Sequence, residues 1–310
     1  MASGSLNEPW GLFGPDSMIW RVNRESAVAL AGTCAILMQF AHPKVAAGVR
    51  DHSRFEVDPA GRLFRTLDLT MAIVFGPRPA AMQAIGAINA RHRTVRGPGY
   101  SAMDPELLLW VHATLVYSAL RGYQVLVGPL SEAESDRYYQ ETTEIGTLLG
   151  IPRDRYPARL DGFDAYLNEM IDEGTVRVGA DARRMGQVVL RPRFPGVPRA
   201  AFTPLTIITA GLLPATLREG YGLRWGPVER TAFAACRLAM PPLVAIAPPP
   251  VRLLPPARDA YRRLRPPDHE ASAGGGGGEI RTRGGVAATR LFESRTLNRS
   301  DTPPGGHCIS

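Results

Sequence analysis

The sequence has 310 residues, and His92 is the side chain in it whose type and position best suit metal binding. In a predicted helix it shares a face with Met82, Ile85, Ile88 and Val95, so we expect its ring to point into the protein. A buried imidazole must either form hydrogen bonds or coordinate a metal, because an unsatisfied polar group costs about 1–3 kcal/mol. A histidine in such a place is more often a hydrogen-bonded core residue than a ligand. The pattern alone leaves both interpretations open.

A second group of polar side chains lies on the preceding predicted helix. Arg62, Arg65 and Thr66 are spaced i, i+3 and i+4, so they share one helical face. Such a face can simply be solvated. Two guanidiniums and a hydroxyl can also hold an anion or handle protons opposite His92, and we predict these three residues as catalytic candidates.

Three further histidines in the predicted helical region are weaker candidates. His112 shares a predicted stripe with Leu108 and Leu115, which makes it the rival metal ligand and a second cofactor-binding candidate. His42 and His52 lie in the AHP and DHS segments, where a structural role is expected and hydrogen bonding to a bound group is the alternative. We therefore rank His92 first and His112 second.

Spacing excludes several other kinds of site. The sequence has no HExxH, no paired Glu-x-x-His, no P-loop and no GxGxxG, which argues against zincins, di-iron bundles and nucleotide-binding enzymes. Cys34, Cys236 and Cys308 are far apart and form no CxxC pair, so neither a disulfide framework nor a structural zinc site is expected.

The elements that must position these residues are predicted to be helices, so the fold class is all-α. Caps and prolines punctuate the chain: Asp104-Pro105 and the capping box of Ser131 with Glu134 each start a helix. The predicted helices cover approximately residues 24–41, 58–76, 79–96, 104–122, 131–150, 160–173, 180–190, 204–221 with a kink at Pro214, 227–240 and 257–264.

The proline-rich segment from Pro241 is predicted to run along the domain as an extended strap. After it the composition changes to AGGGGG and a polar stretch, so we predict a disordered tail over residues 266–310. Residues 1–265 are predicted to form a single helical domain.

Several stretches together resemble a known family. They are GPDSMIW near Gly14, LMQFAHPKVAAGVRDHSRF from Leu37, RLFRT from Arg62, RHRTVRG around His92 and DPELLLWVHATL from Asp104. In this order they are similar to the haem-b domain shared by latex-clearing protein and the MpaB oxygenases. The similarity covers roughly residues 10–225.

This resemblance implies a haem b cofactor enclosed in a helical pocket, with His92 binding the iron. The family's arginine and threonine pair falls on Arg62 and Thr66, and Arg62 is a candidate to hold the haem propionates. Arg65 stands where latex-clearing protein has a lysine that can occupy the distal iron position. A guanidinium is always protonated and cannot coordinate in that way, which argues against rubber as the substrate. Asp51 and Glu56 are the nearest acids to the family's distal carboxylate.

The resemblance further implies a haem-dependent oxygenase, or another oxidoreductase, that acts on a hydrophobic, isoprenoid or other unsaturated substrate with O₂. The alternative is a haem sensor or a carrier of an apolar ligand that catalyses nothing. Substrate turnover with O₂ uptake distinguishes the two.

Charge and composition limit the partners and the location. The net charge of +7 comes from scattered arginines with one lysine, Lys44, and no nucleic-acid-binding motif is present, so we expect no nucleic acid partner. No secretory signal or spanning segment is recognised, and a cytoplasmic protein is expected. The apolar stretches 202–217 and 243–254 are expected to pack in the core, with peripheral contact to a membrane as the alternative.

Overall fold

The computed structural model describes residues 10–52, 59–192 and 196–265, and of residues 59–66 it describes the backbone alone. These ranges belong to one compact unit. The predicted tail, residues 266–310, lies outside the described residues.

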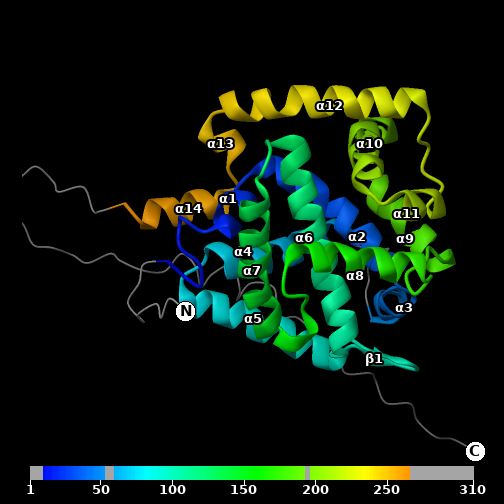
Figure 1. The fold of residues 1–310 in the computed structure, drawn as a ribbon, viewed down its shortest axis with the longest axis horizontal. Coiled ribbons are helices and arrows are strands. Elements are labelled where there is room, and N and C mark those ends of the chain that lie inside the picture. The colour runs from blue at the N-terminus through cyan, green and yellow to red at the C-terminus, as the bar shows by residue number, and fades with distance from the viewer. Residues whose placement is uncertain (1–9, 53–58, 193–195, 266–310) are drawn as a thin grey trace, which may run out of the picture. The chain divides into compact units, whose positions relative to one another are not determined.

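The described ranges contain helices and a single short hairpin, which confirms the all-α prediction. Figure 1 shows their arrangement. The α-helices are α1 (Met18–Asn23), α2 (Gly32–Ala41), α3 (Pro43–His52), α4 (Pro59–Phe75), α5 (Arg78–Thr94), α6 (Pro105–Leu126), α7 (Glu132–Leu148), α8 (Leu160–Asp172), α9 (Ala180–Leu190), α10 (Thr203–Leu212), α11 (Ala215–Gly220), α12 (Pro227–Ile246), α13 (Pro249–Arg252) and α14 (Pro255–Arg263). The 3₁₀ helices are η1 (Ser26–Ala31), η2 (Arg153–Arg155) and η3 (Arg199–Phe202), and the hairpin pairs β1 (Arg96–Gly97) with β2 (Tyr100–Ser101).

Local signals start the helices where the sequence predicts them. The side chain of Asp104 accepts a hydrogen bond from the backbone N–H of Glu106 at 3.0 Å and caps α6. Ser131 and Glu134 form the predicted capping box of α7. These bonds satisfy N–H groups that the first turn of a helix leaves without partners.

Helices α2 and α6 pack against each other in the centre of the unit. Two fully buried tryptophans join the central layers through side-chain hydrogen bonds to backbone carbonyls. Trp110 of α6 donates to Met38 of α2 at 3.2 Å, and Trp20 of α1 donates to Val74 of α4 at 2.9 Å. Burying these indoles with their N–H groups paired gains apolar contact without leaving an unsatisfied donor.

The extended strap predicted from Pro241 is wrong for its first part, because α12 continues through Pro241 and Pro242 to Ile246. A proline inside a helix removes a backbone donor, which leaves the carbonyls of Arg237 and Leu238 without their i+4 partners. Both residues are exposed, so water can bond these carbonyls. That solvent access explains why the helix tolerates two prolines.

Among the described residues no single helix is both long and apolar enough to cross a membrane. One bent pair, residues 26–41 and 43–52, passes the test of length and composition, with an angle of 101° between its halves.

Candidate functional site

Helix α5 carries His92 near its C-terminal end. Ala84 and Ile85 are buried in a cluster with Ile73 of α4, and Ile88 packs against that cluster. His92 follows Ile88 by four residues, which places it on the same face one turn further along and half buried. The sequence prediction of an inward-facing ring therefore agrees with the packing of this helix.

One residue of the predicted stripe is misplaced. Met82 is 43% exposed, whereas its neighbour Ala81 is fully buried. The buried face of α5 thus starts one position earlier than the hydrophobicity of the residues suggests.

The ring of His92 has a buried nitrogen with no partner. Its Nδ1 atom is shielded from solvent and makes no hydrogen bond to any group that the structure describes. Burial lowers the pKa of His92, so the imidazole is neutral near pH 7. A neutral ring with an unpaired nitrogen can bind a metal or accept a hydrogen bond, and without either the burial costs about 1–3 kcal/mol.

Asn89 shares this feature, and the sequence analysis did not select it. It lies one turn before His92 on α5; its Nδ2 donates to the carbonyl of Leu148 at 3.1 Å, but its buried Oδ1 has no partner within the described ranges. Asn89 precedes His92 by three residues, and this spacing could have indicated from the sequence that the two side chains share a face. Together the two side chains put two unpaired polar atoms on one face of α5.

The predicted catalytic residues Arg62, Arg65 and Thr66 lie in the first half of α4. Their backbone is helical, and their side chains lie outside the described residues. A short turn joins α4 to α5 and the two helices pack together, so they run antiparallel. The backbone of the three candidates therefore lies along the half of α5 that carries His92. The positions are brought together, and their side-chain roles stay predictions.

The end of α3 is tied to the segment that follows His92. The Nε2 atom of His52 lies 2.9 Å from the carbonyl of Arg96, and Arg91 donates to the carbonyl of His52 at 3.0 Å. Gly99 turns the β1–β2 hairpin with φ +77°, a left-handed conformation that favours glycine. His52 thus has the structural role expected for it.

Asp51 is already occupied as a hydrogen-bond acceptor. Its carboxylate pairs with Arg50 at 2.8 Å and accepts the hydroxyl of Tyr100 at 2.8 Å. Hydrogen bonds from Arg50 and then Tyr100 lower the pKa of Asp51, which weakens it as a base. The other acid considered, Glu56, lies outside the described residues.

His112 is a buried residue of α6, and its ring contacts Tyr156, which follows η2. The hydroxyl of Tyr156 is 3.1 Å from its Nδ1, and the two rings meet edge to face with centroids 5.6 Å apart. Burial lowers the pKa of His112 to about 4, and a hydrogen bond with the backbone of Thr142 opposes this shift. A Cβ at Gly146 would overlap the Tyr156 hydroxyl, so a glycine is needed there. Because protein groups already satisfy this ring, the geometry favours His92 over His112 as the ligand.

The predicted stripe around His112 also needs a correction. Leu115 is 41% exposed, whereas Leu108 and His112 are buried. His42 is buried as well, and its Nδ1 accepts the backbone N–H of Lys44 at 3.2 Å, which caps α3. Of the histidines in the described ranges, His92 alone has a buried ring nitrogen without a partner among the described residues.

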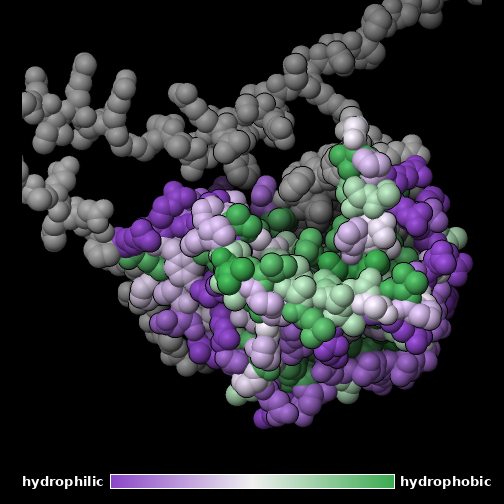
Figure 2. Space-filling view, turned by 90° about the horizontal axis from the view of Figure 1, so that it is seen from above, coloured by the Kyte–Doolittle hydropathy of each residue, from purple (hydrophilic) through white to green (hydrophobic). Residues whose placement is uncertain are grey.

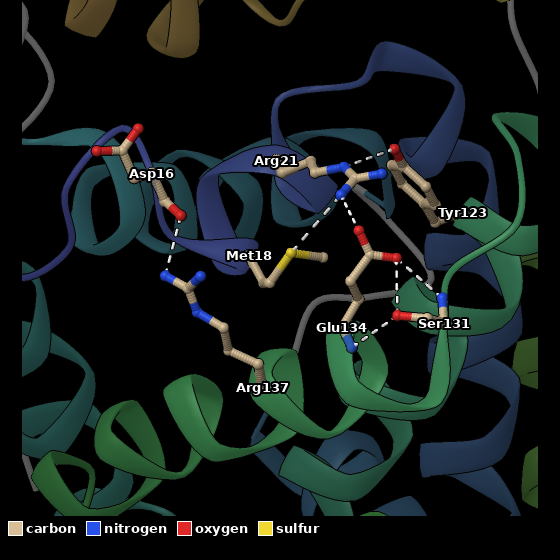
Figure 3. Close-up of polar contacts among 7 residues, drawn as sticks. All are labelled: Asp16, Met18, Arg21, Tyr123, Ser131, Glu134 and Arg137. Atoms are coloured by element: carbon tan, nitrogen blue, oxygen red, sulfur yellow. Dashed lines mark hydrogen bonds and ion pairs between the residues drawn. The ribbon is translucent and has the colours of Figure 1, made fainter.

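Two surface depressions lie away from His92. They are lined by residues of α1, α7 and adjoining loops. Figure 3 shows the contacts beneath one of them: Arg21 of α1 pairs with Glu134 of α7 and donates to the hydroxyl of Tyr123 at 3.4 Å, and Arg137 donates to the carbonyl of Asp16 at 3.0 Å. These contacts fasten α1 to α7, and we assign them a structural role.

Within the described ranges no three or more histidine, cysteine, aspartate or glutamate side chains are grouped so that they could hold a metal ion. The candidate at His92 is therefore a single protein ligand rather than a cluster.

Comparison with known proteins identifies a family. The one described as "ER-bound oxygenase mpaB/B'/Rubber oxygenase, catalytic domain" matches residues 20–241. Two curated relatives, the uncharacterized proteins Mb2261 of Mycobacterium bovis and Rv2237 of Mycobacterium tuberculosis, are each 29% identical over 209 residues. The alignment covers 64% of this chain and 81% of each relative. No solved structure matches the chain significantly.

Proposed function

Since this chain belongs to the MpaB and rubber oxygenase catalytic-domain family, we propose that it is a haem-b-dependent oxygenase that acts on a hydrophobic substrate with O₂. Membership of an oxygenase family supports the general class of reaction. The haem, the iron ligand and the nature of the substrate are the parts that we add to it.

The observation that carries the proposal is the unpaired nitrogen of His92. A buried polar atom nearly always has a partner, and an exception needs an explanation. In a haem-loaded protein the iron and a group hydrogen-bonded to the other ring nitrogen would satisfy this imidazole. His92 therefore fits the role of iron ligand. The resemblance adds Arg62 as a partner of the propionates, and His112 is the weaker candidate for the iron.

The residues of the chain have definable tasks in this proposal. Burial keeps the imidazole of His92 neutral, which leaves a lone pair for coordination. Arg62 and Arg65 would contribute fixed positive charge, and the hydroxyl of Thr66 would hold or pass a proton beside the reacting oxygen. When bound, the haem supplies the redox chemistry, for which amino-acid side chains are not suited.

The proposed substrate is an unsaturated, isoprenoid or lipid-like molecule, and the proposed reaction is oxidative cleavage of a carbon–carbon double bond. The resemblance of the sequence to this family is what supports a hydrophobic substrate. Arg65 in the place of a lysine argues against rubber itself.

The test is haem content. We expect purified protein to show a Soret band and a b-type pyridine haemochrome spectrum with about one haem per chain. His92→Ala is expected to lose haem affinity by roughly 100-fold, and added imidazole is expected to restore the Soret band. His52→Ala is the matched control, because His52 is also half buried but is hydrogen-bonded to Arg96. It should keep its haem.

Colourless protein after supplementation with haem, or a Soret band unchanged in His92→Ala, would refute the haem assignment. The alternative of a non-catalytic carrier then remains, and binding of an unsaturated lipid without O₂ uptake would support it. Haem-loaded protein that consumes O₂ with such a lipid supports the oxygenase.

A further inference from the structure

Helix α12 exposes apolar side chains along the outside of the helical unit. Of the ten large hydrophobic residues that are exposed in the described part of the chain, five lie between residues 228 and 251. We call them the α12–α13 face: Val228, Leu238, Leu243, Ile246 and Val251. Leu238 is 78% and Ile246 is 79% exposed. Figure 2, which views the molecule from the side of α12, shows a hydrophobic band across this surface. Monomeric soluble proteins seldom expose apolar side chains in such a group.

The register of α12 makes this face continuous. Thr231, Ala234, Leu238 and Ala245 recur at spacings of three, four and seven, and all are exposed. The opposite side packs against α6 and α10, with Val244 buried. The outward side of the helix therefore lacks the charged residues that normally cover a surface helix.

Two apolar stretches, 202–217 and 243–254, were expected to pack in the core, with membrane contact as the alternative. The structure gives them different outcomes. In 202–217, Ile208, Leu212 and Leu217 are buried in the core, which fits the first expectation. In 243–254, Leu243, Ile246 and Val251 are exposed. Only the second segment offers an apolar surface.

Charge beside the face is mainly positive. Between Glu229 and Asp259 the sequence contains four arginines and no acid, and one of the four, Arg252, pairs with the buried Glu25. Arg230 and Arg237 are exposed on one flank of α12, and neither pairs with a carboxylate among the residues that the structure describes. An apolar helical face with a flanking cationic edge complements a surface that is apolar inside and anionic outside.

From these observations we propose that the α12–α13 face binds the surface of an anionic lipid bilayer. Helix α12 would lie in the interface plane, with Leu238 and Ile246 among the acyl chains and with Arg230 and Arg237 at the lipid phosphates. Pro241 and Pro242 are consistent with a position at the bilayer surface. The carbonyls that these prolines leave without helical donors need water or lipid headgroups near them, and both are present there.

A second copy of this chain fits the face less well. Two copies joined through α12 would place Arg230 and Arg237 of both chains in one interface. The acid on α12, Glu229, already accepts the backbone N–H of Gly226 at 2.9 Å and contacts Arg224 at 3.9 Å. Like charges held close in an interface weaken association. A membrane provides the opposite charge.

The experiment is flotation of the full chain with vesicles of phosphatidylcholine alone or with about 30% phosphatidylglycerol. We expect the protein to float with the anionic vesicles and to be released by about 0.5 M NaCl. Leu238→Glu with Ile246→Glu should abolish flotation. Arg230→Gln with Arg237→Gln should weaken it by roughly 25-fold, because each arginine near an anionic surface contributes about fivefold. All four side chains are exposed, so thermal unfolding should be unchanged.

Leu148→Glu is the matched control, because Leu148 is also partly exposed but lies at the end of α7. It should float like the unmodified protein. Failure of the unmodified protein to float with either vesicle overturns the proposal, and so does equal flotation of the Leu238→Glu, Ile246→Glu variant. A dimer in light scattering that this variant dissociates, without vesicle binding, would assign the face to a second copy. None of these results depends on haem content.

Discussion

The carboxylate of Glu25 is fully buried and accepts two hydrogen bonds from Arg252, at 2.9 Å from Nε and 3.0 Å from Nη2. Arg24 contacts the same carboxylate at 3.2 Å, and Glu25 forms a β-bridge with Leu253. These contacts join the start of η1 to the end of α13, so they fix the late segment of the chain to the early helices. Such a buried carboxylate must keep its partners.

Arg252→Met should lower the free energy of unfolding by about 2–3 kcal/mol, because it leaves the buried Glu25 with Arg24 as its remaining charged partner. Urea denaturation measures this difference. The control is Arg262→Met, whose exposed side chain pairs with Asp259 and should contribute less than about 0.5 kcal/mol. Equal losses in the two variants would contradict a stabilising role for the buried pair.

Gly146→Ala should destabilise the fold by about 1–3 kcal/mol, because the added Cβ overlaps the hydroxyl of Tyr156 and separates it from His112. Tyr156→Phe removes the oxygen that the Cβ meets. The double variant should therefore lose less stability than the sum of the two single variants, which thermal unfolding in a double-mutant cycle can measure. Strict additivity would show that the clash is relieved elsewhere.

Stability should fall with acid in a window set by His112. Burial lowers its pKa from 6.5 to about 4, so between these values the unfolded chain binds a proton that the folded protein does not. The free energy of unfolding is therefore unaffected by this group above pH 6.5. It falls by up to roughly 3 kcal/mol as the pH is lowered toward 4. Urea unfolding at several pH values measures it. His112→Gln should flatten the dependence, whereas a slope as steep as that of the unmodified protein would contradict this origin.

Haem retention, on the proposed function, should withstand mild acid. Burial lowers the pKa of His92, so its ring stays neutral to a pH below the usual 6.5 of histidine. Half of the Soret absorbance should therefore be lost below pH 6.5, measured while circular dichroism shows that the helices persist. Half-loss at or above pH 6.5 would contradict a buried, neutral ligand.

Short-range signals determined much of the fold from the sequence alone. The cap at Asp104 and the capping box of Ser131 with Glu134 involve residues within three positions of each other, so the sequence contains both partners of each bond. Helix type follows from the same local information. The position of His92 on an inward face was predictable for this reason too.

Burial and partnership depended on packing between distant segments. His112 is satisfied by Tyr156, 44 residues later, and Glu25 by Arg252, 227 residues later, and neither pairing has a local signal. Met82 and Leu115 are exposed although their hydrophobicity predicts burial, because none of the helices that the structure describes covers them. The outward apolar side of α12 arises in the same way. Which helices form is determined by the sequence, because the contacts that start and end a helix lie within one chain segment. Which faces of these helices meet is decided by the tertiary structure.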